Sequence, residues 1–356
     1  MVCGDAEPHR KLCKYVRLKV SRFRVDNSSM ANSQFTAVAD YKRLYDRNAI
    51  SHSIRTAVRI GVIEALDEGQ KDLEQLAKET ATDKEVLKLL LDVLVNTELV
   101  ERYAELYALS TVARLIPPQF ADFGDLYWCH LENYVRGGVA LPDNEELPHT
   151  QADFLASSAA MEWLTTPAAI DAASVLDIGT TRTGLRILEI GCGSAIFGST
   201  FVHRDSDSRL VLLDDRSNLK RAEKTIESIG AQNRVQYVEA DYMQLELDHQ
   251  PFDMVIAAGL AHRHSEEQCQ ELFKLVHKHL KPNGEFVVVD AFPGQQEGDT
   301  TRSIMALEIA LRTQQGGLHD PAHFQHLMIM NGYDQIQFAH LPAPPHIWGL
   351  VLAQRN

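Results

Sequence analysis

The sequence predicts an α/β protein with a doubly wound, largely parallel sheet in its C-terminal part and a smaller, mainly helical domain before it. Three observations carry this prediction. From residue 186 onward, short apolar runs alternate with helical segments, and the first run leads into the turn Gly191-Cys-Gly193. Residues 46–114 show the order helix, helix, helix, β-hairpin. Apolar strands that alternate with helices are typical of a parallel sheet covered on both faces.

The composition is that of an ordinary globular protein with room for two cores. The chain has 356 residues, of which 45% are hydrophobic and 24% are charged. Its net charge of −14 argues against nucleic acid or an anionic membrane as a partner. No apolar run approaches the roughly 18 residues that a membrane-spanning helix needs.

The cysteines indicate a reducing environment. They are scattered along the chain and form neither a CxxC pair nor the spacing of a metal site. We therefore expect a cytoplasmic protein that has no disulfide framework and binds no metal. The cysteines are Cys3, Cys13, Cys129, Cys192 and Cys269.

Changes in composition and pattern divide the chain into four expected regions, 1–29, 30–116, 117–180 and 181–356. The first holds seven basic residues against three acidic ones and lacks the apolar core of a secretory signal. We interpret it as a disordered extension, or as the product of a translation start upstream of Met30. An anchor to an acidic partner is the alternative.

Region 30–116 has the pattern of a winged-helix domain. Apolar residues recur at helical spacing from Ile50 to Leu66, and Thr82-Asp-Lys-Glu85 has the signature of a capping box that opens a third helix. Runs 99–103 and 106–109 alternate like the strands of a hairpin.

A winged-helix pattern raises the question of DNA binding. A recognition helix needs basic and amide side chains on its exposed face, but the third helix offers a mixed, slightly acidic set. We therefore expect a dimerisation domain that gives a homodimer, and keep a ligand-sensing DNA-binding regulator as the less favoured alternative. The polar residues of this helix are Asp83, Lys84, Glu85, Lys88 and Asp92.

Region 117–180 is expected to be helical and to connect the two domains after the break at Pro117-Pro118. It is rich in large apolar side chains. Most of them are expected to pack between domains, while one or two line an apolar pocket for an acceptor molecule. These residues are Phe120, Phe123, Tyr127, Trp128, Tyr134, Met161 and Trp163.

Region 181–356 supplies the sheet. Five apolar runs separated by helical segments are expected to form parallel strands, and two final runs fit an antiparallel hairpin at the sheet edge. The expected strands are 186–190, 209–213, 235–239, 252–257, 285–290, 333–339 and 347–353.

The glycine-rich turn after the first strand narrows the class of ligand that the protein is expected to bind. A dinucleotide-binding turn needs a third glycine three residues after Gly193, and that position is Ile196. The turn is therefore poorly suited to bind a pyrophosphate at the helix N-terminus. With Glu189 before Gly191, the pattern acidic-x-Gly-x-Gly resembles the S-adenosylmethionine (SAM) loop of class I methyltransferases. SAM has no phosphate; it needs a glycine floor and carboxylates for its amine and ribose hydroxyls.

Acidic residues also end the next two strands. Asp214 follows Leu210–Leu213 and is expected to accept both ribose hydroxyls, although an N-cap role for the helix after it is the simpler alternative. Asp241 ends the third strand, where it is expected to accept the adenine amino proton while Tyr242 or Met243 covers the ring. Ligands of such sheets sit at the carboxyl ends of the strands, so these positions support one another.

His262 lies in the loop after the fourth strand, on the same side of the sheet. Histidine is the side chain best suited to remove a hydroxyl proton near neutral pH. The simplest alternative for a loop histidine is a surface residue. We favour the role of general base because of the position of His262.

From about residue 46 to its C-terminus the chain resembles the SAM-dependent O-methyltransferases that carry an N-terminal winged-helix dimerisation domain. These include plant phenylpropanoid and flavonoid enzymes and bacterial small-molecule relatives of the hydroxyneurosporene methyltransferase kind. The family's stretch His-Asp-Trp-Ser-Asp-Glu matches His262-Arg-His-Ser-Glu-Glu267. The resemblance implies that His262 is the base and that Asp290 orients it. It also places His319, after Gly316-Gly317, where the family has a second acidic partner.

Four residues depart from the family pattern. Ala195 replaces the third loop glycine, Arg263 and His264 replace the aspartate and tryptophan after the base, and Ala258 replaces a SAM-contacting lysine of the plant enzymes. We expect SAM to be the cofactor and the acceptor side to differ from that of plant phenol methyltransferases. The expected activity is methylation of a hydroxyl on a small aromatic, polyketide or isoprenoid molecule. The alternative is a non-methylating relative: a hydroxylase, decarboxylase or pericyclase.

Overall fold

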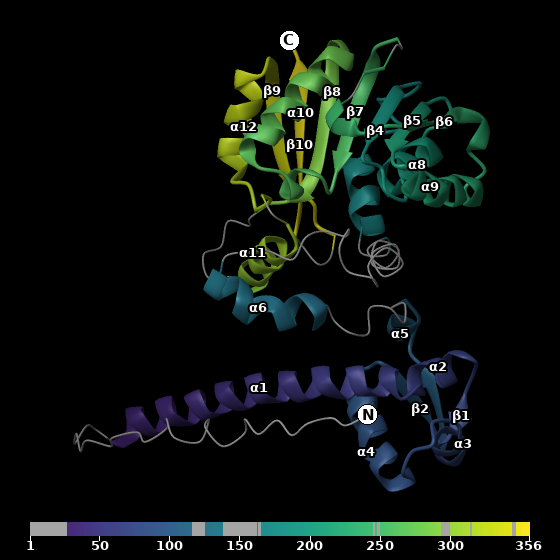
Figure 1. The fold of residues 1–356 in the computed structure, drawn as a ribbon, viewed down its shortest axis with the longest axis vertical. Coiled ribbons are helices and arrows are strands. Elements are labelled where there is room, and N and C mark those ends of the chain that lie inside the picture. Colours follow the sequence, from purple (N-terminus) through teal and green to yellow (C-terminus); the bar gives the residue numbers. More distant parts are fainter. Residues whose placement is uncertain are drawn as a thin grey trace, which may run out of the picture. The chain divides into compact units, whose positions relative to one another are not determined.

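The computed structural model describes residues 27–115, 125–137, 162, 165–244, 246–247, 250–292, 300–313, 315–343 and 347–356 (Figure 1). The expectations for residues 1–26 and for Phe120, Phe123, Met161 and Trp163 fall outside this set. The chain divides into two units, residues 1–53 and 54–356. In the first unit the described residues belong to helix α1 (Asn27–Arg59), whose last turns lie in the second unit.

The second unit begins with a small helical part around a three-stranded antiparallel sheet, in the strand order β1-β3-β2. Its core is formed by Leu66, Leu76, Leu91, Leu94 and other apolar side chains. The elements are α2 (Val62–Asp67), β1 (Lys71–Asp72), α3 (Leu73–Glu79), α4 (Lys84–Asn96), β2 (Val100–Tyr103), β3 (Leu106–Leu109) and α5 (Thr111–Leu115).

Local hydrogen bonds explain where these helices begin. Asp72 and Gln75 form a complete capping box at the start of α3. At α4 the expected box at Thr82 and Glu85 is wrong by one residue. Asp83 is the N-cap and accepts a hydrogen bond from the backbone N–H of Val86 at 2.9 Å.

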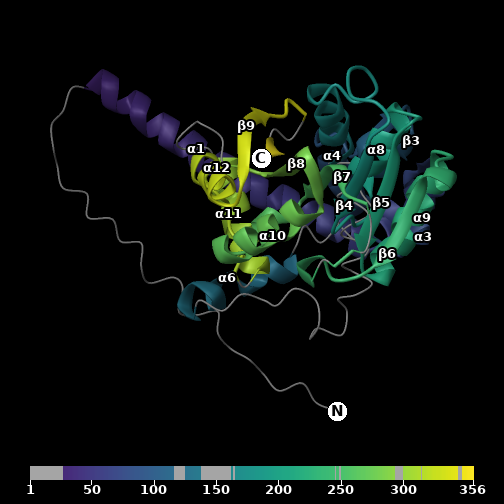
Figure 2. The same cartoon turned by 90° about the horizontal axis from the view of Figure 1, so that it is seen from above.

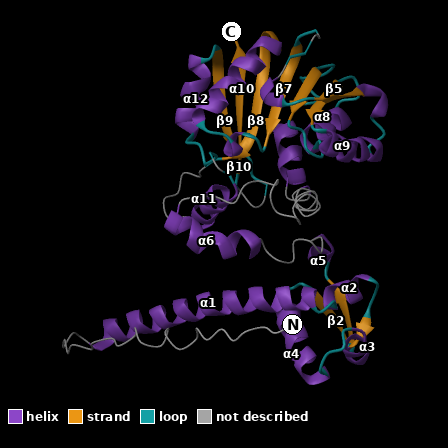
Figure 3. Cartoon of the chain, in the orientation of Figure 1, coloured by secondary structure: helices purple, strands orange, loops and turns teal. Residues whose placement is uncertain are grey.

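The principal sheet has seven strands in the order β6-β5-β4-β7-β8-β10-β9, and it confirms the predicted α/β fold class (Figure 3). The five strands from β6 to β8 are parallel, while β10 runs antiparallel to β8 and to β9. Their bounds are β4 (Arg186–Ile190), β5 (Arg209–Asp214), β6 (Val235–Glu239), β7 (Phe252–Ala258), β8 (Leu280–Ala291), β9 (Tyr333–His340) and β10 (Trp348–Arg355).

Helices cover both faces of this sheet (Figures 1 and 2). Alternate side chains of the strands pack against α8 (Ile196–Arg204), α9 (Arg216–Ser228) and a helix over residues 165–175 on one face. The other face packs against α10 (Glu266–His279) and α12 (Pro321–Met330). Two further helices, α6 (Asp125–Gly137) and α11 (Thr300–Arg312), contact each other.

The strand order places a topological switch beside β4. The chain winds outward from β4 through β5 and β6, and then returns to its other side with β7 and β8. Ligands of open α/β sheets bind outside the carboxyl ends of the strands at such a point. A ligand site is therefore expected at the carboxyl ends of the parallel strands β4, β5, β6, β7 and β8.

Candidate cofactor and active site

The turn after β4 depends on two glycines in the left-handed backbone region, Gly191 with φ 58° and Gly193 with φ 55°. A Cβ on Gly191 would lie 2.7 Å from Cδ2 of Leu260, so the close approach of Leu260 also favours a residue without a side chain at this position. The same contact shows that the loop carrying Leu260, two residues before His262, lies against the glycine turn. Ala195 has φ 60°, a conformation that suits the glycine it replaces.

Asp214 ends β5 and faces the glycine turn. Its Oδ2 accepts a hydrogen bond from the N–H of Gly193 at 2.8 Å, while Oδ1 accepts from the N–H of Asp215 and from Nδ2 of Asn218. The N-cap of α9 is Asp215, which accepts from the N–H groups of Ser217 and Asn218. Asp214 is therefore not the helix cap, and the simpler alternative for this residue is wrong.

Glu189 lies beneath the turn. Its side chain is 2% exposed and accepts a hydrogen bond from the N–H of Gly198, in the first turn of α8, at 3.0 Å. Burial raises the pKa of Glu189 to about 8, against the effect of that hydrogen bond. A Cβ on Gly198 would lie 2.4 Å from the carboxyl, so a glycine is required there. In this structure the contact of Glu189 joins β4 to α8, which makes it a support of the turn.

We expect Glu189→Gln to flatten the pH dependence of stability. Between its ordinary pKa of 4.5 and about 8, Glu189 is ionised in the unfolded chain and protonated in the fold, so wild-type stability falls as the pH rises through this window. Glutamine imitates the protonated form. In thermal unfolding, the Tm of the variant minus the Tm of wild type should therefore increase from pH 5 to pH 8. Parallel Tm curves would contradict this, and Glu239→Gln, at an exposed carboxyl, is the control.

Asp241, Tyr242 and Met243, which are predicted to bind the adenine, follow β6, the third strand of the principal sheet in chain order. Asp241 is exposed, and its carboxylate accepts from the N–H of Met243 at 2.9 Å and from Nε2 of Gln244 at 3.2 Å. Tyr242 and Met243 are partly buried against the core on the α10 side of the sheet. The aspartate is therefore open to a ligand, with the two apolar side chains beside it.

His262 and Asp290 form a hydrogen-bonded pair across the ends of β7 and β8. Nδ1 of His262 lies 2.7 Å from Oδ1 of Asp290, whose Oδ2 accepts from the backbone N–H of His262. Asp290 is 1% exposed; burial would raise its pKa, but His262 and the N–H of Ala291 hold the net pKa below its usual value. The ionised carboxylate accepts a hydrogen bond from Nδ1–H of His262, which leaves Nε2 as the ring atom that can accept a proton.

The backbone of the His262 turn is held from a distant segment. Gly317 donates its N–H to the carbonyl oxygen of His262 at 3.0 Å, and Nε2 of His319 lies 2.7 Å from the carbonyl oxygen of Ala261. A Cβ on Gly316 would lie 2.2 Å from the carbonyl oxygen of His262. His319 thus contacts the chain beside the predicted base, not its imidazole. The catalytic role that the resemblance implies for His319 stays a prediction.

Two contacts in the site were not foreseen. Nε2 of His264 lies 3.0 Å from the hydroxyl of Tyr242, and the two rings meet edge to face. Burial lowers the pKa of His264, with Arg263 and His262 acting in the same direction. The other contact is that of Asn218 with Asp214. Asp214 belongs to β5 and Asn218 to α9, so no helical spacing signals this contact in the sequence.

Two family models match parts of the chain. A family model for a methyltransferase domain matches residues 187–284, and one for an O-methyltransferase dimerisation domain matches residues 43–117. No curated protein sequence matches significantly.

Solved structures share the fold at low identity. Human N-acetylserotonin methyltransferase in complex with SAM is 19% identical over 89% of this chain and 98% of its own, with TM-score 0.71. The mitomycin 7-O-methyltransferase MmcR is 17% identical over 92% and 100%, with TM-score 0.74. The N,N-8-amino-8-demethyl-D-riboflavin dimethyltransferase of Streptomyces davawensis is 19% identical over 89% and 99%, with TM-score 0.72.

Fold and domain matches together define a class I SAM-dependent methyltransferase, with SAM as its cofactor. The chain combines an O-methyltransferase dimerisation domain with a methyltransferase domain. Among the described residues no group of three or more His, Cys, Asp or Glu side chains could hold a metal ion. None of the helices described is long and apolar enough to cross a membrane.

Proposed function

We propose that the protein transfers the methyl group of SAM to a hydroxyl of a small molecule, with His262 as general base. The observation that carries the proposal is the pair of His262 Nδ1 and Asp290 Oδ1 at 2.7 Å, in a loop that touches the glycine turn through Leu260. The aromatic, polyketide or isoprenoid character of the acceptor is part of the same proposal.

The residues around the turn suit SAM. Gly191 and Gly193 present bare backbone, and Oδ2 of Asp214 accepts one N–H, so that it keeps a lone-pair direction for a ribose hydroxyl. We assign the adenine end to Asp241, Tyr242 and Met243. When bound, SAM supplies an electrophilic methyl group on a sulfonium centre.

The protein's part is to hold the acceptor oxygen in line with that methyl group and to remove its proton. Alignment can contribute roughly 7–11 kcal/mol, and a base adds about 10²–10⁴ in rate. The acceptor proton passes to Nε2 of His262, the oxygen–carbon bond forms, and the carbon–sulfur electron pair leaves with the sulfur. Asp290 stabilises the imidazolium produced, because its carboxylate is buried and stays ionised.

A labelling experiment tests the proposal. The protein is incubated with methyl-labelled SAM and small-molecule extracts of its host, and we expect label in a product together with S-adenosylhomocysteine (SAH). A product without label would favour the non-methylating alternative, which the exchanges at Arg263 and His264 keep open. Failure to bind SAM or SAH in calorimetry would overturn the cofactor assignment as well.

We further propose a cytoplasmic homodimer formed through the N-terminal domain. Residues 43–117 match a dimerisation domain, and α1 exposes five large apolar side chains. A monomer seldom leaves such a row in water. A second copy of the chain is the expected cover, and the described cysteines Cys129, Cys192 and Cys269 are free, as suits a reducing compartment. The exposed side chains are Phe35, Val38, Tyr41, Leu44 and Tyr45.

We expect the double substitution Val38→Asp and Tyr41→Asp to convert the dimer into monomer, because it places two charges in an apolar contact. Light scattering coupled to gel filtration measures the mass. Arg47→Glu is the control, since helical spacing places it on the opposite side of α1. A double variant that stays dimeric would exclude this face of α1 as the interface.

A further inference from the structure

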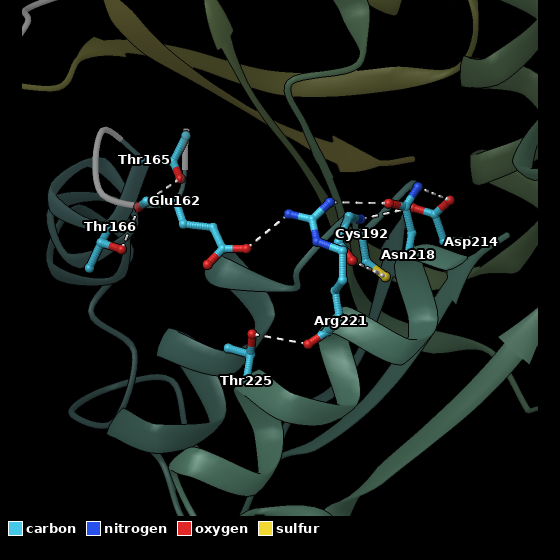
Figure 4. A network of polar contacts seen from close by, with 9 residues as sticks. Glu162, Thr165, Thr166, Cys192, Asp214, Asn218, Arg221 and Thr225 are labelled. Carbon is cyan, nitrogen blue, oxygen red and sulfur yellow. Dashed lines mark hydrogen bonds and ion pairs between the residues drawn. The ribbon is translucent and has the colours of Figure 1, made fainter. Parts of the chain in front are cut away.

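A chain of polar contacts leads away from the glycine turn through Asp214, Asn218 and Arg221 to Glu162 (Figure 4). Nδ2 of Asn218 donates to Oδ1 of Asp214 at 3.0 Å, and Nη1 of Arg221 donates to Oδ1 of Asn218 at 3.5 Å. Nη2 of Arg221 donates to Oε1 of Glu162 at 2.9 Å. Asn218, Arg221 and Glu162 were not expected to take part in cofactor binding.

Asn218 is the link that needs a defined orientation. An amide has one end that accepts and one that donates, whereas a guanidinium only donates. Arg221 therefore turns the amide oxygen of Asn218 toward itself, and the NH₂ group then faces the carboxylates of Asp214 and Asp215, each at 3.0 Å. Without the guanidinium, the amide oxygen loses its donor, and only the two carboxylates still hold the NH₂ group toward Asp214.

Arg221 is itself fixed by a partner distant in the sequence. Its side chain is 15% exposed and that of Glu162 33%, so the ion pair is largely shielded from water. The carbonyl oxygen of Glu162 accepts from the hydroxyls of Thr165 and Thr166 at 3.1 and 2.7 Å. Glu162 is thereby tied to the beginning of the helix over residues 165–175, as Figure 4 shows.

We propose that Asn218 and Arg221 are positioning residues for cofactor binding, which hold the Asp214 carboxylate in the orientation that receives a ribose hydroxyl at Oδ2, with Glu162 as their anchor. The proposal rests on the ribose role of Asp214 in the proposed function. Asp214 touches the cofactor; Asn218 and Arg221 act through it. Because Asp214 is 8% exposed, water can supply few donors to replace Nδ2 of Asn218 once that side chain is lost.

The test measures the affinity for two ligands by calorimetry, SAH and an SAH analogue that lacks both ribose hydroxyls. We expect Asn218→Ala to weaken SAH binding about tenfold, the effect of losing one hydrogen bond to a charged group, and Arg221→Met to weaken it severalfold. Binding of the deoxy analogue should change little. A merely structural disturbance would weaken both ligands equally, and this result would overturn the proposal.

Matched variants make the result decisive. Lys220→Met removes an exposed cation from the neighbouring position of α9 and should leave both affinities unchanged. Arg221→Lys keeps the charge without the planar fork and serves if the methionine variant folds poorly. As a single substitution, Glu162→Gln should weaken SAH binding. Combined with Arg221→Met it should cause no further loss, because both substitutions remove the same ion pair. Additive effects would contradict the anchor role.

The Asp214→Ala variant distinguishes the ribose role of Asp214 from the positioning role of Asn218 and Arg221. If it lowers the affinity for SAH but not for the deoxy analogue, the ribose role of Asp214 is supported. If it does so while Asn218→Ala and Arg221→Met have no effect, the positioning role is wrong and the ribose role survives. If Asp214→Ala affects both ligands equally, the ribose role itself fails.

Discussion

Replacing His262 by glutamine should lower kcat by about 10²–10⁴-fold, which is the usual contribution of a general base. The affinity for SAM should stay nearly unchanged, because the hydrogen bonds that hold the turn engage backbone atoms of residues 261 and 262. Single-turnover transfer of labelled methyl measures the chemical step, and calorimetry measures binding. This variant has the largest expected effect on the reaction.

Asp290→Asn is the companion variant. Asparagine keeps the shape of the side chain, but it neither fixes the Nδ1 proton nor stabilises an imidazolium. A loss of kcat comparable to that of His262→Gln would support the paired mechanism. If His262→Gln retained the wild-type kcat, the base would lie elsewhere or the reaction would need none. A fall in SAM affinity equal to the fall in kcat would assign His262 to binding instead.

Gly316→Ala should lower kcat by about 10²-fold with SAM binding retained. The added Cβ would stand 2.2 Å from the carbonyl oxygen of His262 and 2.6 Å from the hydroxyl of Thr313, so the backbone of one segment must move. A displacement of the base by about 1 Å is enough for an effect of this size. The measurements are kcat with labelled SAM and the affinity for SAH.

The neighbouring glycine provides the control. A Cβ on Gly317 would have no heavy atom within 4 Å, and Gly317→Ala leaves its N–H free to donate to His262. We expect this variant to keep most of its activity. Equal losses in the two variants would show that the segment responds to any change in its flexibility, and not to the contact at His262.

The strands of the sheet and the residues at their ends could be predicted from the sequence because both depend on local pattern. An apolar run marks a buried strand, and a parallel arrangement brings the ends of successive strands to one edge. Asp214, Asp241 and His262 were found in this way. The pair of His262 and Asp290 followed from the family resemblance, and their separation of 28 residues gives no local signal.

The remainder depends on packing between distant segments. Glu189 resembled a ligand contact in the sequence, yet its buried carboxyl is directed at Gly198. The pair of Arg221 and Glu162 is 59 residues apart, and the contact of His319 with Ala261 is 58 residues apart. In α4, Val86 and Leu89 fit a buried apolar helix by type, but they are 62% and 66% exposed. Their exposure follows from the way this helix meets its neighbours.

The way the His262 turn is held bears on how this enzyme could be redesigned. Gly317 and His319 bind main-chain oxygens, and the backbone N–H of His262 is bound by Asp290, so these bonds are indifferent to the side chains at positions 263 and 264. The departures from the family pattern at Arg263 and His264 therefore leave the backbone around the proposed base, His262, held in place. Substitutions at these two positions should therefore leave the backbone of residues 261 and 262 undisturbed.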